Sequence, residues 1–94
     1  NVHGNETSSA EASMMTLYEL VKPANTKDKA WLDKSLIIID PCLNPDGTER
    51  YANFHNGVVG KNYNPDLYAR EHREPWPGGR YNHYYFDLNR DNIN

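Results

Sequence analysis

The chain has 94 residues, 37% of them hydrophobic, and a mean hydropathy of −0.93. Such a chain forms one small domain or part of a larger one, and it buries only about 60–65% of its unfolded surface. The net charge of −3 and isoelectric point near 5.7 argue against a general nucleic-acid binder, which would carry a basic surplus. No signal peptide or transmembrane run is present. The single cysteine, Cys42, excludes an internal disulfide and is expected to be a buried structural thiol.

The first motif, His3-Gly4-Asn5-Glu6, places an imidazole three residues before a carboxylate. Both groups are zinc-ligand types, with bond lengths of about 2.0–2.2 Å. On a glycine turn that opens a helix, the two side chains can converge on one point. A His-x-x-Glu pattern alone is more often a solvated helix start than a metal site, so its interpretation depends on the rest of the chain.

The first half of the chain predicts a helix followed by a strand. Apolar residues at helical spacing from Ala10 to Val21 predict a helix that begins near Ser8 and ends before Pro23. Residues 24–35 are polar and predict a loop with one short helical turn. Residues 36–40 are almost continuously apolar, which is typical of a strand covered on both faces in a parallel sheet. Helix and buried strand together make half of a βαβ unit.

The second half is mostly loop in this interpretation. Asn44-Pro45-Asp46-Gly47 contains two turn-forming pairs and predicts a tight turn at the strand end. Residues 48–79 are polar and rich in Asn, Pro, Gly and Tyr, and a loop of that length is often functional. The stiff segment of residues 75–79 can hold Arg80 in a fixed position. Residues 84–88 predict a short strand that leads into Asn89-Arg90.

Three motifs therefore stand in order along the chain: His3-Gly4-Asn5-Glu6, Asn44-Pro45-Asp46-Gly47 and Asp87-Leu88-Asn89-Arg90. In this order, with a helix after the first and a strand before the second, they resemble the zinc carboxypeptidase family. The resemblance covers residues 1–94 as the N-terminal-to-middle part of a catalytic domain, with both ends truncated. We therefore interpret the chain as an excerpt of a longer protein.

The resemblance implies an α/β fold, part of a mixed, mostly parallel sheet with helices on both faces. Ligands gather at the carboxyl ends of strands in such sheets. Val2-His3, Ile39-Asp40 and Leu88-Asn89 would then be strand-end positions. An excerpt of such a sheet would expose strand edges, through which self-association is expected.

The resemblance also assigns roles to single residues. His3 and Glu6 match two of the three protein ligands of a catalytic Zn²⁺. Asn89 and Arg90 match the pair that grips the terminal carboxylate of a peptide or protein substrate, a role that suits a guanidinium and an amide.

A further arginine in the family polarises the scissile carbonyl and stabilises the oxyanion. Arg80 is the first choice, because its distance from Asn89 resembles the spacing in the deglutamylating branch of the family. Arg73 and Arg70 are the alternatives.

The implied mechanism is metal-assisted hydrolysis, in which zinc activates a water and a glutamate acts as general base. The family's third ligand and its general base match no residue of this chain. His55, His72 and His83 are expected to be polar loop histidines and not substitutes. Because catalytic zinc normally has three protein ligands, we expect the 94-residue chain alone to bind zinc weakly or not at all and to hydrolyse nothing.

Two alternative functions stay open. Amidohydrolases of the aspartoacylase and succinylglutamate desuccinylase type share similar first and last motifs and cleave N-acyl amino acids. A non-catalytic protein that keeps only the carboxylate clamp is the other. The resemblance favours a secreted or periplasmic location and leaves the substrate side chain open.

Overall fold

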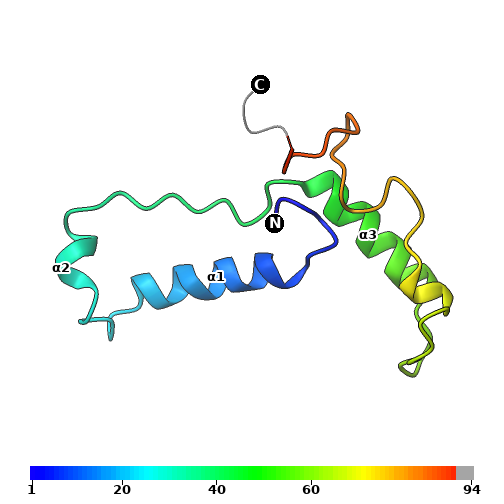
Figure 1. The fold of residues 1–94 in the computed structure, drawn as a ribbon. Coiled ribbons are helices and arrows are strands. Elements are labelled where there is room, and N and C mark those ends of the chain that lie inside the picture. Colours follow the sequence, from blue (N-terminus) through cyan, green and yellow to red (C-terminus); the bar gives the residue numbers. More distant parts are fainter. Residues whose placement is uncertain (91–94) are drawn as a thin grey trace. The chain divides into compact units, whose positions relative to one another are not determined.

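The computed structural model of the chain describes residues 1–90 and contains helices, turns and open segments (Figure 1). The elements in chain order are α1 (Ser8–Val21), α2 (Lys29–Leu32), α3 (Pro45–Val58) and the 3₁₀ turn η1 (Arg70–His72). The chain divides into two compact units. One contains residues 8–41. The other, here called the site unit, joins residues 1–7 to residues 42–90 and holds all the predicted site residues.

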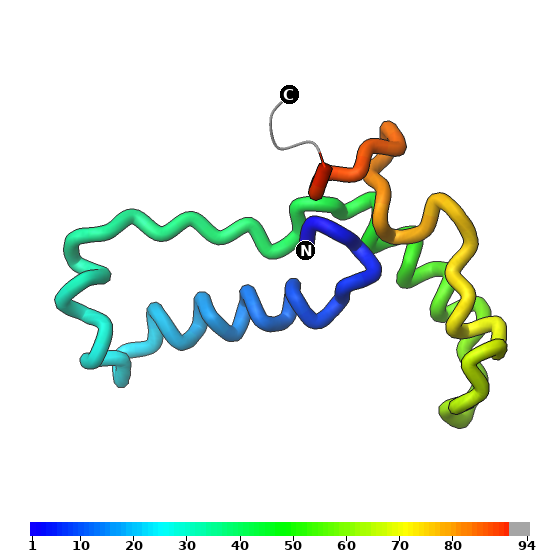
Figure 2. The backbone as a smooth tube through the Cα atoms, viewed as in Figure 1, coloured from blue at the N-terminus to red at the C-terminus, as the bar shows by residue number. Residues whose placement is uncertain are grey.

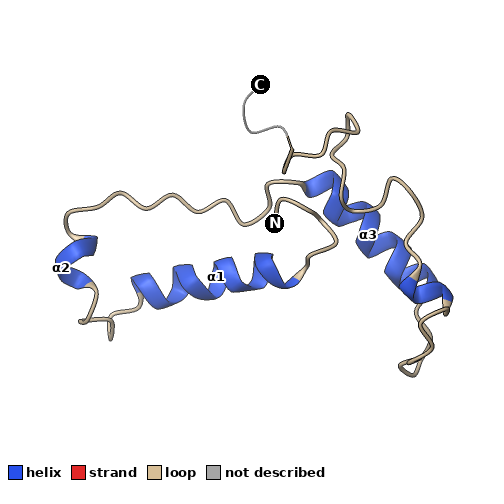
Figure 3. Ribbon diagram, viewed as in Figure 1, coloured by secondary structure: helices blue, strands red, loops and turns tan. Residues whose placement is uncertain are grey.

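The predicted parallel sheet is wrong, because no residue from 1 to 90 lies in a β-strand (Figure 3). Residues 36–40 form an open segment instead (Figure 2). Leu36 and Ile38 are 88% and 85% exposed, in contrast to the predicted burial. A strand exists through backbone hydrogen bonds to a neighbouring strand, and no described segment forms such a ladder with this one. Continuous apolar character alone is therefore insufficient to make these residues a strand.

The second predicted strand, residues 84–88, is a turn. The Asn82 side-chain Oδ1 accepts hydrogen bonds from the backbone N–H groups of Tyr84 and Phe86, at 2.9 and 3.0 Å. Tyr85 has a φ of 64°, which is incompatible with an extended strand. The described residues form no sheet and so present no strand edge, and self-association of the chain stays a prediction.

The unit of residues 8–41 agrees with the sequence in its helices. α1 begins at Ser8 as predicted and ends two residues before Pro23, and α2 is the predicted short turn of helix. Its apolar positions remain on the surface: Met14 and Tyr18 are 52% and 65% exposed. No hydrophobic residue in the described part of the chain is buried. Neither α1 nor any other helix described is long and apolar enough to cross a membrane.

Helix α3 occupies residues that the sequence predicted to be a turn and a loop. Asn44 is its N-cap, and the side-chain Oδ1 of Asn44 accepts the backbone N–H of Gly47 at 2.9 Å. Pro45 takes the first helical position, where its missing N–H costs nothing. Asp46 adds a negative charge to the first turn, which suits the positive end of the helix dipole. The turn-forming residues therefore start a helix here.

Asn44 also joins three separate segments of the site unit. It is 0% exposed, and its side-chain Nδ2 lies 3.2 Å from the carbonyl oxygen of Val2 and 3.3 Å from that of Arg80. One buried amide thus caps α3 with its oxygen and holds the N-terminal segment and the Arg80 segment with its nitrogen. A buried polar group of this kind is favourable only when its hydrogen bonds are made, as they are here.

Three glycines, Gly4, Gly47 and Gly79, allow the backbones of these segments to come into direct contact. The Gly4 N–H donates to the Gly79 carbonyl oxygen at 2.6 Å. A Cβ on Gly4 would lie 2.0 Å from the Thr48 backbone nitrogen, and one on Gly47 would lie 2.4 Å from the Gly79 oxygen. No real side chain tolerates such distances, so glycine is required where these segments cross.

Replacement of Asn44 by alanine is expected to destabilise the site unit by about 2–4 kcal/mol, since a cap is worth about 1 kcal/mol and each unpaired buried acceptor costs roughly 1–3. Asn44→Asp keeps the cap acceptor but loses the Nδ2 donors, so it should also destabilise. Urea unfolding of the full chain, followed by circular dichroism, measures both. Asn53→Ala, on the exposed face of α3, is the control and should stay within about 0.5 kcal/mol. Equal effects of Asn44→Ala and Asn53→Ala would contradict this role.

A matched pair of glycine variants tests the segment crossing. Gly4→Ala should cost at least about 1–3 kcal/mol, because its Cβ would overlap backbone atoms that cannot move aside. Gly57→Ala lies in α3 with nothing within 4 Å of the added Cβ, and it should stabilise by roughly 0.5–1 kcal/mol. The same unfolding assay compares them. A Gly4→Ala chain as stable as Gly57→Ala would show that the segments are not packed at this distance.

Candidate active site

The imidazole of His3 lies between two carboxylates. His3 is only 5% exposed. Its Nδ1 is 3.1 Å from Oε1 of Glu6, and its Nε2 is 3.2 Å from Oδ1 of Asp87. The first contact joins the two residues predicted to bind zinc. The second joins the N-terminal motif to the last motif across 84 positions of the chain.

The order of these contacts has an electrostatic consequence. A neutral imidazole carries one N–H and one lone pair. When Nε2–H donates to Asp87, the Nδ1 lone pair faces the Glu6 carboxylate, which is also an acceptor. Two acceptors 3.1 Å apart repel each other unless a proton or a cation lies between them. The ligand atoms of one tetrahedral zinc are separated by about 3.4 Å, from bonds of about 2.0–2.2 Å. The 3.1 Å spacing is shorter than this and is that of an ordinary N–H···O hydrogen bond, so it shows His3 and Glu6 in contact, through a shared proton as readily as through a shared metal ion.

Asp87 has a hydrogen-bond donor on each carboxylate oxygen. Oδ1 accepts from His3 and, at 3.0 Å, from the backbone N–H of Asn89. Oδ2 accepts from Arg80. Partial burial of the carboxyl raises the pKa of Asp87. The hydrogen bonds from His3, Arg80 and the Asn89 backbone, together with the charge of Arg80, lower this pKa by a larger amount. The net pKa of Asp87 lies below its ordinary value of 3.8, so the carboxylate is ionised near neutral pH.

Arg80 binds Asp87 through one edge of its guanidinium. Its Nε and Nη2 lie 2.8 and 2.7 Å from Oδ2 of Asp87. The Arg80 side chain is 38% exposed, and among the described residues no hydrogen bond to its Nη1 is formed. One edge of the guanidinium is thus held in place by Asp87.

The segments that carry these side chains are fixed by further polar contacts. The Glu74 carboxylate accepts the Asn5 side-chain Nδ2 at 2.8 Å and also the backbone N–H of Gly79. Arg50 of α3 donates to the carbonyl oxygens of Gly78 and Tyr81, the latter at 3.0 Å. Together with Asn44, these contacts hold the residues on either side of Arg80 against the N-terminal segment.

Asn89 and Arg90, the predicted carboxylate clamp, are exposed and follow Asp87 directly. Their backbone N–H groups bond Asp87, from Asn89 to Oδ1 and from Arg90 to the carbonyl oxygen at 2.9 Å. The guanidinium of Arg90 donates to the Asn89 carbonyl oxygen at 3.2 Å. The backbone of Asn89 and Arg90 is therefore hydrogen-bonded to Asp87, the residue that contacts Nε2 of His3. Among the described residues, no hydrogen bond or ion pair joins the Arg90 side chain to His3.

The alternative arginines lie elsewhere in the site unit. Arg73 places its guanidinium carbon 4.9 Å from the centre of the Tyr68 ring, and Arg70 is exposed in η1. Neither forms a hydrogen bond or ion pair with Asp87 in the described structure. Of the candidate arginines, Arg80 is the one connected to His3.

The other histidines are not part of this cluster. His55 lies in α3, not in the predicted loop, and its ring contacts Tyr51 at 5.9 Å between centroids. His72 bonds the Asn64 carbonyl oxygen at 2.7 Å, and His83 is largely exposed. Residues 1–90 contain no group of three or more His, Cys, Asp or Glu side chains arranged to hold a metal. The predicted zinc ligands His3 and Glu6 are therefore not part of a set of three in this part of the chain.

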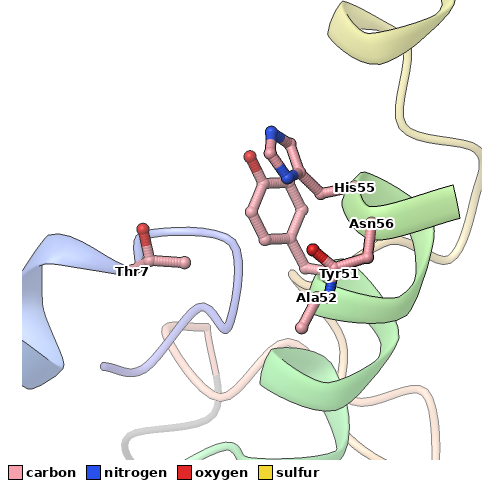
Figure 4. Close-up of a pocket in the computed structure, with 5 residues that line it drawn as sticks. All are labelled: Thr7, Tyr51, Ala52, His55 and Asn56. Atoms are coloured by element: carbon pink, nitrogen blue, oxygen red, sulfur yellow. The ribbon is translucent and has the colours of Figure 1, made fainter. Parts of the chain in front are cut away.

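The site unit also has a hollow, which is lined by residues outside the cluster around His3. It has a volume of about 260 Å³ and is open to solvent (Figure 4). Thr7, which follows Glu6, faces it from one side, and Tyr51 and His55 of α3 face it from the other, with Ala52 and Asn56 completing the lining. It contains none of the predicted site residues, so it does not identify the site.

Comparison with known protein families supplies the decisive observation. The sequence pattern of the zinc carboxypeptidases matches residues 1–92. The chain belongs to the zinc carboxypeptidase family. Membership places it among hydrolases of the metallopeptidase class. Neither curated proteins nor solved structures gave a match.

Two important residues of the candidate site were not singled out from the sequence. Asp87 was noted only as part of the last motif, although its carboxylate contacts His3. Asn44 was interpreted as a turn residue. The signal that could have identified it is an Asn-Pro pair followed by an acidic residue, which is also the pattern of a helix N-terminus.

The lowered pKa of Asp87 can be measured directly. In carbon-detected NMR of the full chain, the Asp87 carboxyl should titrate below 3.8. Because the folded-state pKa is depressed, the stabilisation from the ionised carboxylate is present above the unfolded value and is lost as the pH falls through the folded one. Arg80→Gln should move the pKa upward, while Lys61→Gln, a control on a distant loop, should not. A wild-type pKa at or above 3.8 would contradict the described contacts.

Proposed function

We propose that the protein carrying this sequence is a zinc-dependent metallocarboxypeptidase that removes C-terminal residues from peptides. Membership of the zinc carboxypeptidase family supports the reaction class. The observation that carries the assignment to this site is the 3.1 Å approach of His3 Nδ1 to Glu6 Oε1, with Asp87 on the opposite ring nitrogen.

His3 and Glu6 would hold the zinc, with Nδ1 and a carboxylate oxygen as ligand atoms. The ion supplies a Lewis acid that activates water and polarises a carbonyl. With zinc bound at Nδ1, the proton of His3 would lie on Nε2, where Oδ1 of Asp87 is 3.2 Å away and would accept it. A carboxylate hydrogen-bonded to the second nitrogen of a ligating histidine also raises the basicity of the ligand.

Arg80 is proposed to act on the scissile carbonyl. Its guanidinium is permanently charged and is held by Asp87 through two nitrogens, which leaves Nη1 to donate to the substrate oxygen. Donors fixed before the reaction stabilise a developing oxyanion without reorganisation. Asn89 and Arg90 are proposed to bind the terminal carboxylate, and their exposure leaves the side chains accessible to a peptide.

The full-length protein should cleave peptides that end in a free carboxylate and should fail on the same peptides with an amidated C-terminus, because an amide cannot pair with Arg90 as a carboxylate does. Release of the terminal amino acid, detected by mass spectrometry, measures this. N-acyl amino acids serve as the comparison. Cleavage of these instead of peptides would favour the amidohydrolase alternative, and cleavage of neither would favour the non-catalytic one.

His3→Ala is expected to lower both zinc affinity and peptidase activity of the full-length protein by at least about 100-fold, because it removes a ligand. Calorimetric zinc titration and a peptide hydrolysis assay measure the two quantities. His83→Ala is the matched control, because this histidine is 72% exposed in its side chain, and it should leave both unchanged. Unaltered zinc affinity in His3→Ala would refute the assignment of the metal site.

A further inference from the structure

The hollow between Thr7 and α3 has two aromatic rings on one wall. Tyr51 and His55 lie one helical turn apart on α3, and their ring centroids are 5.9 Å apart at an interplanar angle of 33°. Residues four apart on a helix lie on the same face. Both residues are half-buried, and Thr7 faces them across the hollow (Figure 4). The helix thus presents an aromatic surface, with the side chain of Thr7 on the opposite wall.

The size and lining of the hollow limit what it can bind. Its volume of about 260 Å³ is below the roughly 300–1,000 Å³ of pockets that enclose a whole drug-sized ligand, so it suits one side chain of a larger molecule. The five described residues that line it carry no carboxylate, ammonium or guanidinium group. A charged side chain would therefore lack a permanently charged partner there, whereas a neutral ring can pack against Tyr51 and His55. An aromatic side chain is the occupant that fits best.

The position of the hollow relative to the candidate site follows from the order of contacts. Asp87 lies on Nε2 of His3, and the backbone N–H of Asn89 is bonded to Asp87. Glu6 lies on Nδ1, the other ring nitrogen, and Thr7 follows Glu6 directly in the chain. Consecutive Cα atoms are about 3.8 Å apart, close to the rise of about 3.3 Å per residue in an extended peptide. The hollow therefore begins one residue beyond Glu6, on the Nδ1 side of His3.

We propose that the hollow is a substrate subsite, which binds the side chain of the residue that contributes the scissile carbonyl and prefers an aromatic ring. The inference rests on the proposed function, in which Asn89 and Arg90 bind the terminal carboxylate and the scissile carbonyl lies beside His3 and Glu6. A peptide held at both points extends toward its amino terminus on the Glu6 side. The side chain of its penultimate residue then reaches the hollow at Thr7.

Peptides that differ only in the penultimate residue test the subsite in the full-length protein. With phenylalanine there, kcat/KM should exceed that of the alanine peptide about three- to ten-fold, the range that one aromatic pair supplies. Aspartate there should give no gain over alanine. Tyr51→Ala should bring the phenylalanine-to-alanine ratio close to one. Ala52→Trp, which fills the hollow from an exposed helix position, should do the same. Tyr63→Ala is the matched control on a tyrosine that is 80% exposed, and it should keep the wild-type ratio.

A binding measurement separates the subsite from the proposed function. N-acetylphenylalanine amide has the ring but no free carboxylate. In proton NMR of the full chain, it should shift the ring signals of Tyr51 and His55 but not those of Tyr63. N-acetylalanine amide should shift none of these signals.

Three results would overturn the proposal: a wild-type protein without preference at the penultimate residue, a preference that survives in both Tyr51→Ala and Ala52→Trp, or absent shifts with the phenylalanine amide. If the full-length protein cleaves no peptide, the proposed function fails. The NMR shifts then still decide whether the hollow binds an aromatic side chain.

Discussion

The buried amide of Asn44 is the contact on which the site unit depends. Its oxygen starts α3, and its nitrogen binds the carbonyl oxygens of Val2 and Arg80, so the three segments are held around one side chain. The crossing works only because Gly4 and Gly79 bring their backbones together. No hydrophobic residue is buried in the described part of the chain, and these polar contacts take the place that an apolar core has in most domains. Their correct pairing is therefore more important here than in a protein with a large core.

This arrangement places charged groups in alternating order. The cation of Arg80 binds the anion of Asp87, which binds the imidazole of His3, which faces the anion of Glu6. Each group stabilises its neighbour, and the position between His3 and Glu6 favours a proton or a metal ion. Zinc is the metal of the zinc carboxypeptidase family, and we propose that it takes this position. In this proposal, the site depends on polar contacts that extend from Arg80 through Asp87 to His3 and Glu6.

Sequence reasoning identified motifs and the first two helices more readily than tertiary structure. The regular apolar spacing of α1 predicted its bounds well. His3 and Glu6 do lie in contact, while their role as zinc ligands stays a prediction. The strand at residues 36–40 failed because strands require partners, which a local pattern does not reveal. α3 was missed because Asn44-Pro45 suits both a turn and a helix start, and because its sequence is polar on average, unlike that of α1. The contact of Asp87 with His3 spans most of the chain, so no local pattern predicts it.

The most direct measurement is zinc-edge anomalous diffraction from crystals of the full-length protein grown with the metal. A single peak between Nδ1 of His3 and the Glu6 carboxylate, with Asp87 on the opposite ring nitrogen, is the predicted result. An anomalous peak at any other place, or a His3 ring that presents Nε2 to the metal, would contradict the account.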